Sequence, residues 1–307
     1  MSNSQGRILV VRGGSLGEFI LTCPVFAALR AQFPETAIEV LGYPRIAGLA
    51  KAAGLIDEVR SIETRAAAGF FARNAPLDQD LSDYFSDFSV IFSYLYDPDG
   101  FFQMNVCKVS TAQFVQGRAK PDEGATLHAS DTFLKPLERF AIFDADAVPR
   151  LALPQRISQE PMVAIHPNPE TGPRAWPESK WRTLVAAIAT RSAYRVLLIG
   201  DESQMRLLQR MAAELPASRA RIVGSAASEQ LAVELGGCQG FIGHDSGISH
   251  LAAALGVPCV TLWGNSNVTI WQPRGSNVTV LKNRAGAIGV TQEEVLSALP
   301  MVWAGAE

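Results

Sequence analysis

Residues 240–262 are GFIGHDSGISHLAAALGVPCVTL, in which two apolar runs, 240–243 and 258–262, flank a segment of helical character at 247–255. Apolar runs of this length are typical of parallel strands that are buried on both faces. A helix that joins two parallel strands forms a βαβ unit. The stretch therefore predicts an α/β fold in which a parallel sheet carries helices on its faces.

The same alternation of strand and helix extends upstream through the second half of the chain. Strands are expected at residues 162–166, 195–199 and 221–223, and helices at residues 178–190, 203–214 and 228–235. Together with residues 240–262, these segments predict a doubly wound sheet.

The first half of the chain follows the same pattern. Its expected strands are residues 7–11, 37–42, 58–62 and 88–94, and its expected helices are residues 16–33, with a bend at Pro24, and 46–53. Residues 66–87 are polar and lack clean periodicity. We expect an irregular insertion there, which shapes a binding site together with residues 101–105.

Three prolines, Pro149, Pro154 and Pro161, stand among polar residues where the first series ends and the second begins. Such a segment is typical of a domain boundary. We therefore expect two doubly wound, Rossmann-like domains, residues 1–155 and 156–307, that face each other across a central cleft. The pattern leaves open whether the last helix packs back on the first domain.

The composition argues against several classes of protein. A net charge of −3 on 307 residues gives no electrostatic reason to expect nucleic acid as a partner. Four cysteines without CxxC spacing argue against a zinc site and against a disulfide scaffold. The apolar run near the N-terminus, residues 8–11, is too short for a signal peptide or a membrane span. We expect a cytoplasmic protein.

Ligands of doubly wound sheets bind at the carboxyl ends of the strands, so the strand-to-helix turns are the candidate site positions. In the last such turn, Gly247 permits close approach of a diphosphate to the backbone, and Ser246 and Ser249 offer hydroxyl groups. Asp245 and His250 lie beside them. The alternative is that Asp245 or Ser246 only caps the helix. A serine hydrolase is disfavoured because the turn lacks GxSxG.

The first strand-to-helix turn contains GGSLGEF, with its glycines at Gly13, Gly14 and Gly17. It matches neither the GxGxxG dinucleotide pattern nor a P-loop, which needs lysine followed by serine or threonine. Glu18 places a carboxylate at the start of the helix, where it suits a general base that acts on a hydroxyl group. The alternative is that the Glu18 carboxylate only stabilises the helix, by complementing the positive end of its dipole.

The second half opens with a proline-rich loop, HPNPETGPRAWPESKW, at residues 166–181. Its polar anchors are His166, Asn168, Arg174 and Lys180. The guanidinium group of Arg174 has the shape to bind a phosphate through two hydrogen bonds. The alternative is a surface arginine that binds nothing.

Three stretches together resemble glycosyltransferase family 9, the ADP-heptose:lipopolysaccharide heptosyltransferases. They are VRGGSLGEFILTCPVFAALR at residues 11–30, HPNPETGPRAWPESKWRTL at 166–184 and FIGHDSGISHLAAALGVPCVTLWGNSNVTIWQPRG at 241–275. The run DSGxSHLAAA that begins at Asp245, followed by GxPxVxLWG, is the most specific part. The three occur in order over nearly the whole chain.

The resemblance implies a GT-B fold, in which the first domain binds the acceptor and the second binds the nucleotide-sugar donor. It also implies that Ser246, Gly247 and Ser249 hold the donor diphosphate without a bound metal or other cofactor. The implied donor-side residues are His166, Asn168, Arg174, Glu202, Gln204, Asp245, Ser246, Gly247, Ser249 and His250, and the acceptor-side residues are Gly14, Ser15 and Gly17, with Glu18 as the catalytic base.

Two positions depart from the family pattern. Glu18 stands where the family usually carries the aspartate proposed as the base, and Arg174 stands where it usually carries lysine. The longer carboxylate keeps the acid–base chemistry but moves it by about one bond length. The arginine keeps the charge with a different hydrogen-bonding shape. Relatives carry a carboxylate near the nucleoside after the strand at 195–199, and Glu202 and Gln204 are the candidates for this role.

The resulting prediction is an inverting transfer of a heptose-like sugar, from an ADP-sugar or a similar donor, to a lipopolysaccharide-type or lipid-linked glycan. Contact with the cytoplasmic face of the inner membrane would then be peripheral. The alternatives are a non-catalytic nucleotide-sugar binding protein derived from a GT-B enzyme, and a GT-B epimerase or phosphorylase. A nicotinamide-dependent oxidoreductase is disfavoured by the missing GxGxxG.

Overall fold

The computed structural model describes residues 6–153, 160–167, 175–264 and 266–299. The chain divides into two compact units, Met1–Leu151 and Ala152–Glu307, and each contains one parallel sheet. Within these described residues, no helix is long and apolar enough to cross a lipid bilayer.

The sheet of the first unit has the strand order β3-β2-β1-β4-β5, and every neighbouring pair is parallel. Its strands are β1 Arg7–Arg12, β2 Ala37–Gly42, β3 Glu58–Ser61, β4 Val90–Ser93 and β5 Gln113–Gln116. Its helices are α1 Leu16–Ile20, α2 Cys23–Gln32, α3 Pro44–Ala52, α4 Arg65–Ala68, α5 Gln79–Ser86, α6 Phe101–Val109 and α7 Ala129–Leu134, with 3₁₀ turns η1 Gly69–Phe71 and η2 Lys135–Phe140.

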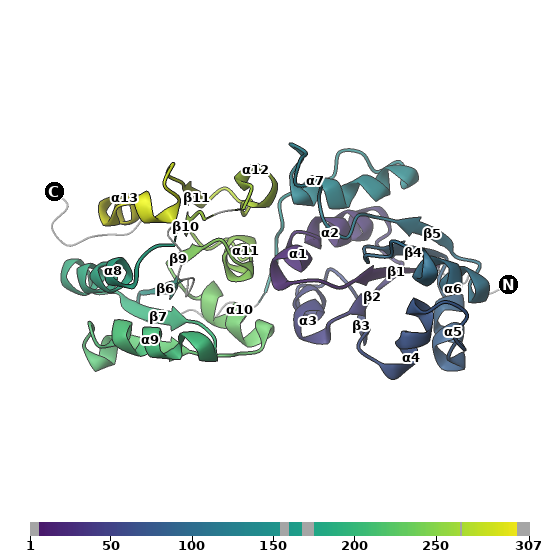
Figure 1. Cartoon of the computed structure of the whole chain (residues 1–307), viewed down its shortest axis with the longest axis horizontal. Coiled ribbons are helices and arrows are strands. Elements are labelled where there is room, and N and C mark those ends of the chain that lie inside the picture. The colour runs from purple at the N-terminus through teal and green to yellow at the C-terminus, as the bar shows by residue number, and fades with distance from the viewer. Residues whose placement is uncertain (1–5, 154–159, 168–174, 265, 300–307) are drawn as a thin grey trace. The chain divides into compact units, whose positions relative to one another are not determined.

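Helices cover both faces of the first sheet, with α2 and α7 on one side and α4 and α5 on the other (Figure 1). Leu9 and Val11 of β1 point toward the side of α4 and α5, where they join one core cluster with Phe70 and Phe85. Ile8 and Val10, which alternate with them along β1, are also buried, so the central strand is apolar on both faces, as a parallel strand between two helical layers must be.

The segment expected to be one helix at residues 16–33 is two helices. α1 ends at Ile20, and α2 begins at Cys23 with Pro24 in its first turn. Proline lacks the backbone N–H that a helix interior needs, whereas the N–H groups of a first turn have no intrahelical acceptor. The chain therefore restarts the helix at Pro24.

The expectation of an irregular insertion at residues 66–87 is wrong. This segment forms most of α4, all of η1 and α5, and it contributes Phe70, Leu81 and Phe85 to the core. Asn105 of α6 is also buried, and its Nδ2 donates to the carbonyl oxygens of Phe70 and Ala72 at 3.1 and 3.0 Å. Asn105 thus holds the irregular link that follows η1, a tertiary role that the local periodicity does not encode.

The sheet of the second unit has the order β11-β10-β9-β6-β7-β8, again parallel throughout. Its strands are β6 Met162–His166, β7 Arg195–Ile199, β8 Ala220–Val223, β9 Gly240–His244, β10 Cys259–Leu262 and β11 Val278–Leu281. Its helices are α8 Glu178–Arg191, α9 Met205–Ala212, α10 Ser228–Gly236, α11 Gly247–Ala254, α12 Val268–Trp271 and α13 Gln292–Ser297, with η3 Glu202–Gln204, η4 Ala217–Arg219 and η5 Ala287–Gly289.

In this unit, α8, α9 and α13 cover one face of the sheet, and α10, α11 and α12 cover the other (Figure 1). Trp181 of α8 and Leu296 of α13 belong to one core cluster with Ile165 of β6. The last described helix, α13, therefore packs within the second unit. The central strands β6 and β9 are neighbours, so their carboxyl ends bring two strand-to-helix loops together.

Candidate functional site

The turn between β9 and α11 is closed by its own side chains. Ser246 is the N-cap of α11, and its hydroxyl accepts the N–H of Ser249 at 3.4 Å. The buried hydroxyl of Ser249 donates in turn to the carbonyl oxygen of His244, the last residue of β9. The turn is therefore held in one conformation, with the first-turn N–H groups of α11 at its end.

The neighbouring strand β6 supplies a second residue to this turn. His166 ends β6, and its Nδ1 lies 3.2 Å from the hydroxyl oxygen of Ser246. The imidazole rings of His166 and His244 are 4.6 Å apart between centroids. Nδ1 of His244 lies 3.2 Å from the carbonyl oxygen of His166. A carbonyl oxygen only accepts, so the hydrogen of this contact is on His244 Nδ1.

The imidazole of His166 is uncharged at neutral pH. Burial is the main cause that lowers its pKa to about 3; the neighbouring His244 acts in the same direction, and Asp201 opposes the shift. His166 therefore contributes a hydrogen bond to Ser246 and no positive charge, because its neutral ring carries one donor and one acceptor nitrogen.

Asp245 links this turn to the loop after β10. The hydroxyl of Ser266 donates to Asp245 Oδ2, and the indole N–H of Trp263 donates to the carbonyl oxygen of Ser266 at 2.9 Å. His250, in the second turn of α11, is buried. Gly247 is the first residue of α11.

The residues after β7 have a positioning role. Gln204 is buried, its Oε1 accepts the N–H of Asp201 at 2.8 Å, and its Nε2 donates to the carbonyl oxygen of Pro167 at 3.0 Å. Gln204 thus holds Pro167, the residue that follows His166, while Glu202 is exposed at the start of η3.

Two further donor-side residues expected from the sequence, Asn168 and Arg174, lie outside the described residues. Lys180, the last polar anchor of the same loop, donates to the carbonyl oxygens of Ile288 and Val290 at 2.7 and 2.8 Å. Lys180 therefore ties α8 to the segment before α13.

In the first unit, the turn between β1 and α1 forms a capping box. Ser15 is the N-cap of α1 and accepts the N–H of Glu18, while Glu18 Oε2 accepts the N–H of Ser15 at 2.7 Å. Gly14 has a positive φ of 95°, and a Cβ atom there would lie 2.5 Å from Glu18 Oε2. The glycine therefore makes room for the carboxylate, and Gly17 is buried in the first turn of α1.

The second oxygen of Glu18 faces a cation that the sequence did not single out. Lys120 Nζ lies 3.7 Å from Glu18 Oε1. Buried Arg12 joins the two segments, since its Nη2 donates to the carbonyl oxygen of Glu18 at 3.1 Å and its Nη1 to that of Ala119 at 2.8 Å. Burial lowers the pKa of Arg12 to about 10, so Arg12 stays charged at neutral pH.

The sequence prediction assigned no role in these two turns to His244, Lys120 or Arg12. His244 and Arg12 are the last residues of β9 and β1, so the rule that ligands bind at carboxyl strand ends could have indicated both. Lys120 follows β5. This strand has only four residues, with a glutamine at each end, so the sequence periodicity did not predict it. Among the residues described, no group of three or more His, Cys, Asp or Glu side chains is arranged to hold a metal ion.

Two parallel Rossmann-like units, with a capped serine turn after a central strand of the second, define the GT-B class of protein. The family model described as glycosyltransferase family 9 (heptosyltransferase) matches residues 123–296. That match covers more than half of the chain, so the protein belongs to glycosyltransferase family 9.

Known relatives agree with this assignment. Lipopolysaccharide heptosyltransferase 2 of Salmonella typhimurium strain LT2 is 28% identical over 130 residues, which are 41% of this chain and 37% of that protein. The chain thus matches little more than a third of the length of this curated relative.

Solved structures match over almost the whole chain. A glycosyl transferase family 9 protein from Veillonella parvula superposes with a TM-score of 0.76 at 17% identity, covering 97% of each chain. The E. coli heptosyltransferase WaaC with ADP superposes with a TM-score of 0.73 at 18% identity, covering 95% of this chain and 98% of that one. The two-domain, Rossmann-like GT-B fold predicted from the sequence is confirmed.

Proposed function

We propose that the protein is an inverting glycosyltransferase that moves a heptose-like sugar from a nucleotide-diphosphate donor to a lipopolysaccharide-type saccharide. The observation that carries the proposal is the β9–α11 turn, where the Ser246 hydroxyl is held between His166 and Ser249 at the N-terminus of a helix. Backbone N–H groups and the positive end of a helix dipole favour an anion at such a position.

The donor diphosphate would bind at this turn through the backbone N–H groups of Gly247 and its neighbours and through the hydroxyl of Ser246. His166 supports this role, because a neutral partner orients the Ser246 hydroxyl without adding a charge that titrates near neutral pH. These donors need no bound metal to receive the leaving diphosphate. Glu202, Gln204, Asn168 and Arg174 complete the proposed donor site.

The acceptor would react at the other turn. The Glu18 carboxylate takes the proton of the acceptor hydroxyl, and the oxygen forms a bond to the anomeric carbon. The bond from that carbon to the donor diphosphate breaks, and its electron pair leaves with the nucleoside diphosphate. Oε1 of Glu18 is the oxygen available for this step, since Oε2 is bonded to Ser15. Gly14, Ser15 and Gly17 shape the acceptor side.

The sugar and the acceptor are inferred from the relatives. The matching family is described as heptosyltransferase, one relative is named lipopolysaccharide heptosyltransferase 2, and WaaC was solved with ADP. We therefore propose ADP-heptose as the donor and a lipopolysaccharide as the acceptor. The transfer would take place at the cytoplasmic face of the inner membrane. Because these relatives are named as transferases, a transferase is favoured over the non-catalytic binding protein considered above.

The test is a calorimetric titration of the full chain with ADP, GDP, UDP and their sugar conjugates, followed by an assay of diphosphate release with lipopolysaccharide core acceptors. We expect selective binding of one nucleotide and acceptor-dependent release. Ser246→Trp should abolish binding by filling the turn. Thr291→Trp is the matched control, because Thr291 is also an N-cap in the second unit, at helix α13.

Each negative result has a defined meaning. If folded protein binds none of the nucleotides, the donor site proposed here is wrong. If a nucleotide-sugar binds but no acceptor stimulates its turnover, the protein is a binding protein and not a transferase. If Thr291→Trp weakens binding as much as Ser246→Trp does, the ligand site is not at the β9–α11 turn.

A further inference from the structure

Arg12, the last residue of β1, is a buried cation whose partners are backbone carbonyl groups. The residue is 2% exposed. Within the described residues, each hydrogen bond that its guanidinium group donates goes to a carbonyl oxygen, and none goes to a carboxylate. Burying a charge without an acidic partner costs free energy. Stability alone therefore does not explain an arginine at this position.

The guanidinium group joins α1 to the loop that follows β5. Its Nη2 donates to the carbonyl oxygen of Glu18 at 3.1 Å, and its Nη1 donates to that of Ala119 at 2.8 Å. Its Cζ lies 4.5 and 5.9 Å from the ring centroids of Phe133 and Tyr94, so aromatic side chains hold the cation as well. A planar fork with donors in fixed directions can bridge two carbonyl groups in this way.

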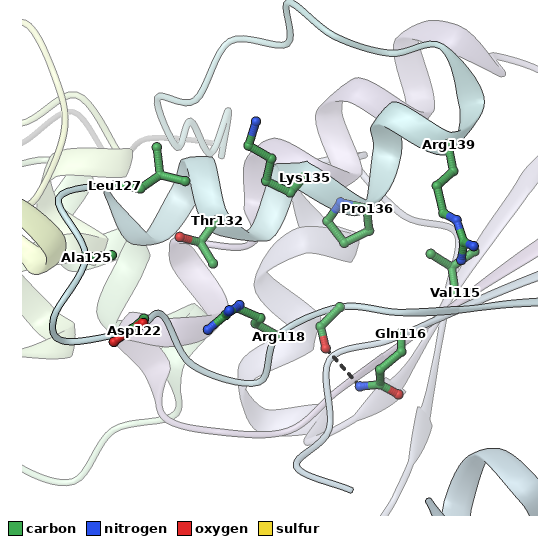
Figure 2. Close-up of a pocket in the computed structure, with 11 residues that line it drawn as sticks. Val115, Gln116, Arg118, Asp122, Ala125, Leu127, Thr132, Lys135, Pro136 and Arg139 are labelled. Carbon is green, nitrogen blue, oxygen red and sulfur yellow. Dashed lines mark hydrogen bonds between the residues drawn. The ribbon is translucent and has the colours of Figure 1, made fainter. Parts of the chain in front are cut away.

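The loop after β5 is anchored at its start, and Arg12 holds the residues that follow. Figure 2 shows this loop passing below Thr132 of α7, with Gln116 at its beginning. The Gln116 amide donates to the carbonyl oxygen of Ser93 at 3.1 Å, and a Cβ atom at buried Gly117 would lie 2.6 Å from the ring of Tyr94. In the described part of the chain, the bond from Arg12 is the only hydrogen bond to the backbone of residues 118–120.

Lys120 ends this segment, and its Nζ lies 3.7 Å from Oε1 of Glu18 although 74% of the lysine side chain is exposed. A lysine side chain is flexible, and a largely solvated one is not fixed by packing. The place of Lys120 therefore depends on the backbone of residues 118–120, which Arg12 holds. The same guanidinium group also holds the backbone of Glu18.

We propose that Arg12 is a positioning residue of the transfer reaction, which holds Lys120 beside the free carboxylate oxygen of Glu18. The inference rests on the transferase function proposed above, and it adds a residue that acts without touching the substrate, because its side chain is buried. The ammonium group of Lys120 attracts Oε1, the oxygen that the capping box leaves free, and so orients it. Misplacing a catalytic group by about 1 Å lowers a rate by roughly 100-fold.

The first experiment measures the placement of Lys120 without turnover. A carbodiimide links a carboxylate to an amine that is in contact with it, and peptide mass spectrometry identifies the linked residues. The full-length wild type should give a Glu18–Lys120 crosslink. Its yield should fall about tenfold in Arg12→Lys and Arg12→Met, because neither replacement has the fork that bridges two carbonyl groups. An unchanged yield in both variants would overturn the proposal.

Lys51 and Glu58 provide the internal control for this measurement. They form an exposed ion pair at 2.7 Å between α3 and β3 of the same unit. Their crosslink should keep its yield in both Arg12 variants, which also shows that the unit is folded. Equal losses of the two crosslinks in both variants would mean that Arg12 only supports the fold, and would overturn the proposal.

The second experiment is a double-mutant cycle on the transfer rate. Arg12→Lys and Lys120→Met should each lower kcat by roughly tenfold and leave KM for the donor unchanged. The double variant should be no slower than the slower single variant, because both changes break the same contact. Losses that multiply in the double variant would show that Arg12 does not act through Lys120.

Arg7→Lys is the matched control for the kinetics. Arg7 is the first residue of β1, at the opposite end of the strand, where its guanidinium group binds Glu39 and Asp87. Its replacement should leave kcat and the Glu18–Lys120 crosslink unchanged. A loss of kcat in Arg7→Lys as large as that in Arg12→Lys would assign the effect to the strand as a whole and overturn the proposal.

The two proposals fail separately. If the crosslink depends on Arg12 but the wild type transfers no sugar to any acceptor, the transferase is wrong while the placement of Lys120 by Arg12 stands. If the wild type transfers sugar and Arg12→Lys and Lys120→Met transfer it equally fast, the positioning role is wrong and the transferase stands.

Discussion

A single oxygen of Glu18 accepts both the backbone N–H and the hydroxyl of Ser15, at 2.7 and 3.1 Å. Its other oxygen faces Lys120 at 3.7 Å. Helix capping and general-base catalysis are alternatives when only the position of a carboxylate is known. With both oxygens placed, they are compatible, because Oε2 caps the helix and Oε1 remains for a substrate hydroxyl.

This division of roles predicts the effect of Glu18→Gln. The amide keeps an oxygen for the capping box but cannot take a proton, so the transfer rate should fall by roughly 10²- to 10⁴-fold with little change in stability. Single-turnover rates and thermal melts measure the two effects.

Glu294→Gln is the matched control for this change. Glu294 occupies the same capping-box position with Thr291 at the start of α13. Its replacement should leave the transfer rate unchanged. A rate for Glu18→Gln within about twofold of the wild type would show that Glu18 is only a cap.

Gly14→Ala should disturb the same carboxylate from the other side. The new Cβ would meet Glu18 Oε2 at 2.5 Å, in addition to the strain of an alanine at a φ of 95°. Gly54→Ala has comparable backbone strain, with a φ of 70°, but its Cβ would meet nothing within 4 Å.

We therefore expect both glycine variants to lose about 1–2 kcal/mol in urea unfolding, from backbone strain alone. Only Gly14→Ala should also lose activity, by about tenfold or more, because the carboxylate must move. Similar activities of the two variants would contradict the close packing of Gly14 on the base.

Ser246→Ala should weaken donor binding more than it destabilises the fold. Loss of an N-cap costs about 1 kcal/mol. Thr64→Ala removes an equivalent cap from α4, where the Thr64 side chain accepts the N–H of Ala67. Calorimetry with the preferred nucleotide should show about tenfold weaker binding for Ser246→Ala and no change for Thr64→Ala. Equal losses in both would assign the effect to general destabilisation.

His166 predicts a pH-dependent stability. Its pKa is about 3 in the folded protein, whereas a histidine in an unfolded chain has a pKa of about 6.5, so the unfolded chain binds the additional proton between these values. Stability should therefore fall as the pH drops from about 6.5 toward 3, by at most about 1.4 kcal/mol per pH unit from this residue.

Urea unfolding of wild type and His166→Gln at pH 7.5 and pH 5 isolates this contribution. Lowering the pH should reduce the unfolding free energy of the wild type more than that of the variant, because only the wild type contains His166. A difference that is the same at both pH values would show that His166 is not held neutral by its surroundings.

Local patterns were sufficient where one segment encodes its own structure. The apolar runs of β1, β6, β7 and β9 predicted those strands, because strands buried between two helical layers are apolar on both faces. The capped turn at Ser246 also follows from local sequence, since a serine after an apolar strand satisfies the first N–H groups of a helix.

Local patterns failed where distant residues supply the environment. Residues 66–87 appeared irregular because α4, η1 and α5 bury only selected side chains, such as Phe70 and Phe85, against β1 and α6. The strand β5 was not predicted because it has only four residues, with the polar residues Gln113 and Gln116 at its ends. Its loop therefore could not be placed beside Glu18.

The sequence by itself determined the two parallel α/β units, the family and the turns that contain Glu18 and Ser246, because strand periodicity and helix capping act over a few residues. The tertiary structure alone decided the partners of these groups. Ser246 meets His166 across 80 residues, and Glu18 meets Lys120 on a loop that follows a different strand. Such contacts arise from strand order, which places the carboxyl ends of chain-distant strands side by side and which no local pattern specifies.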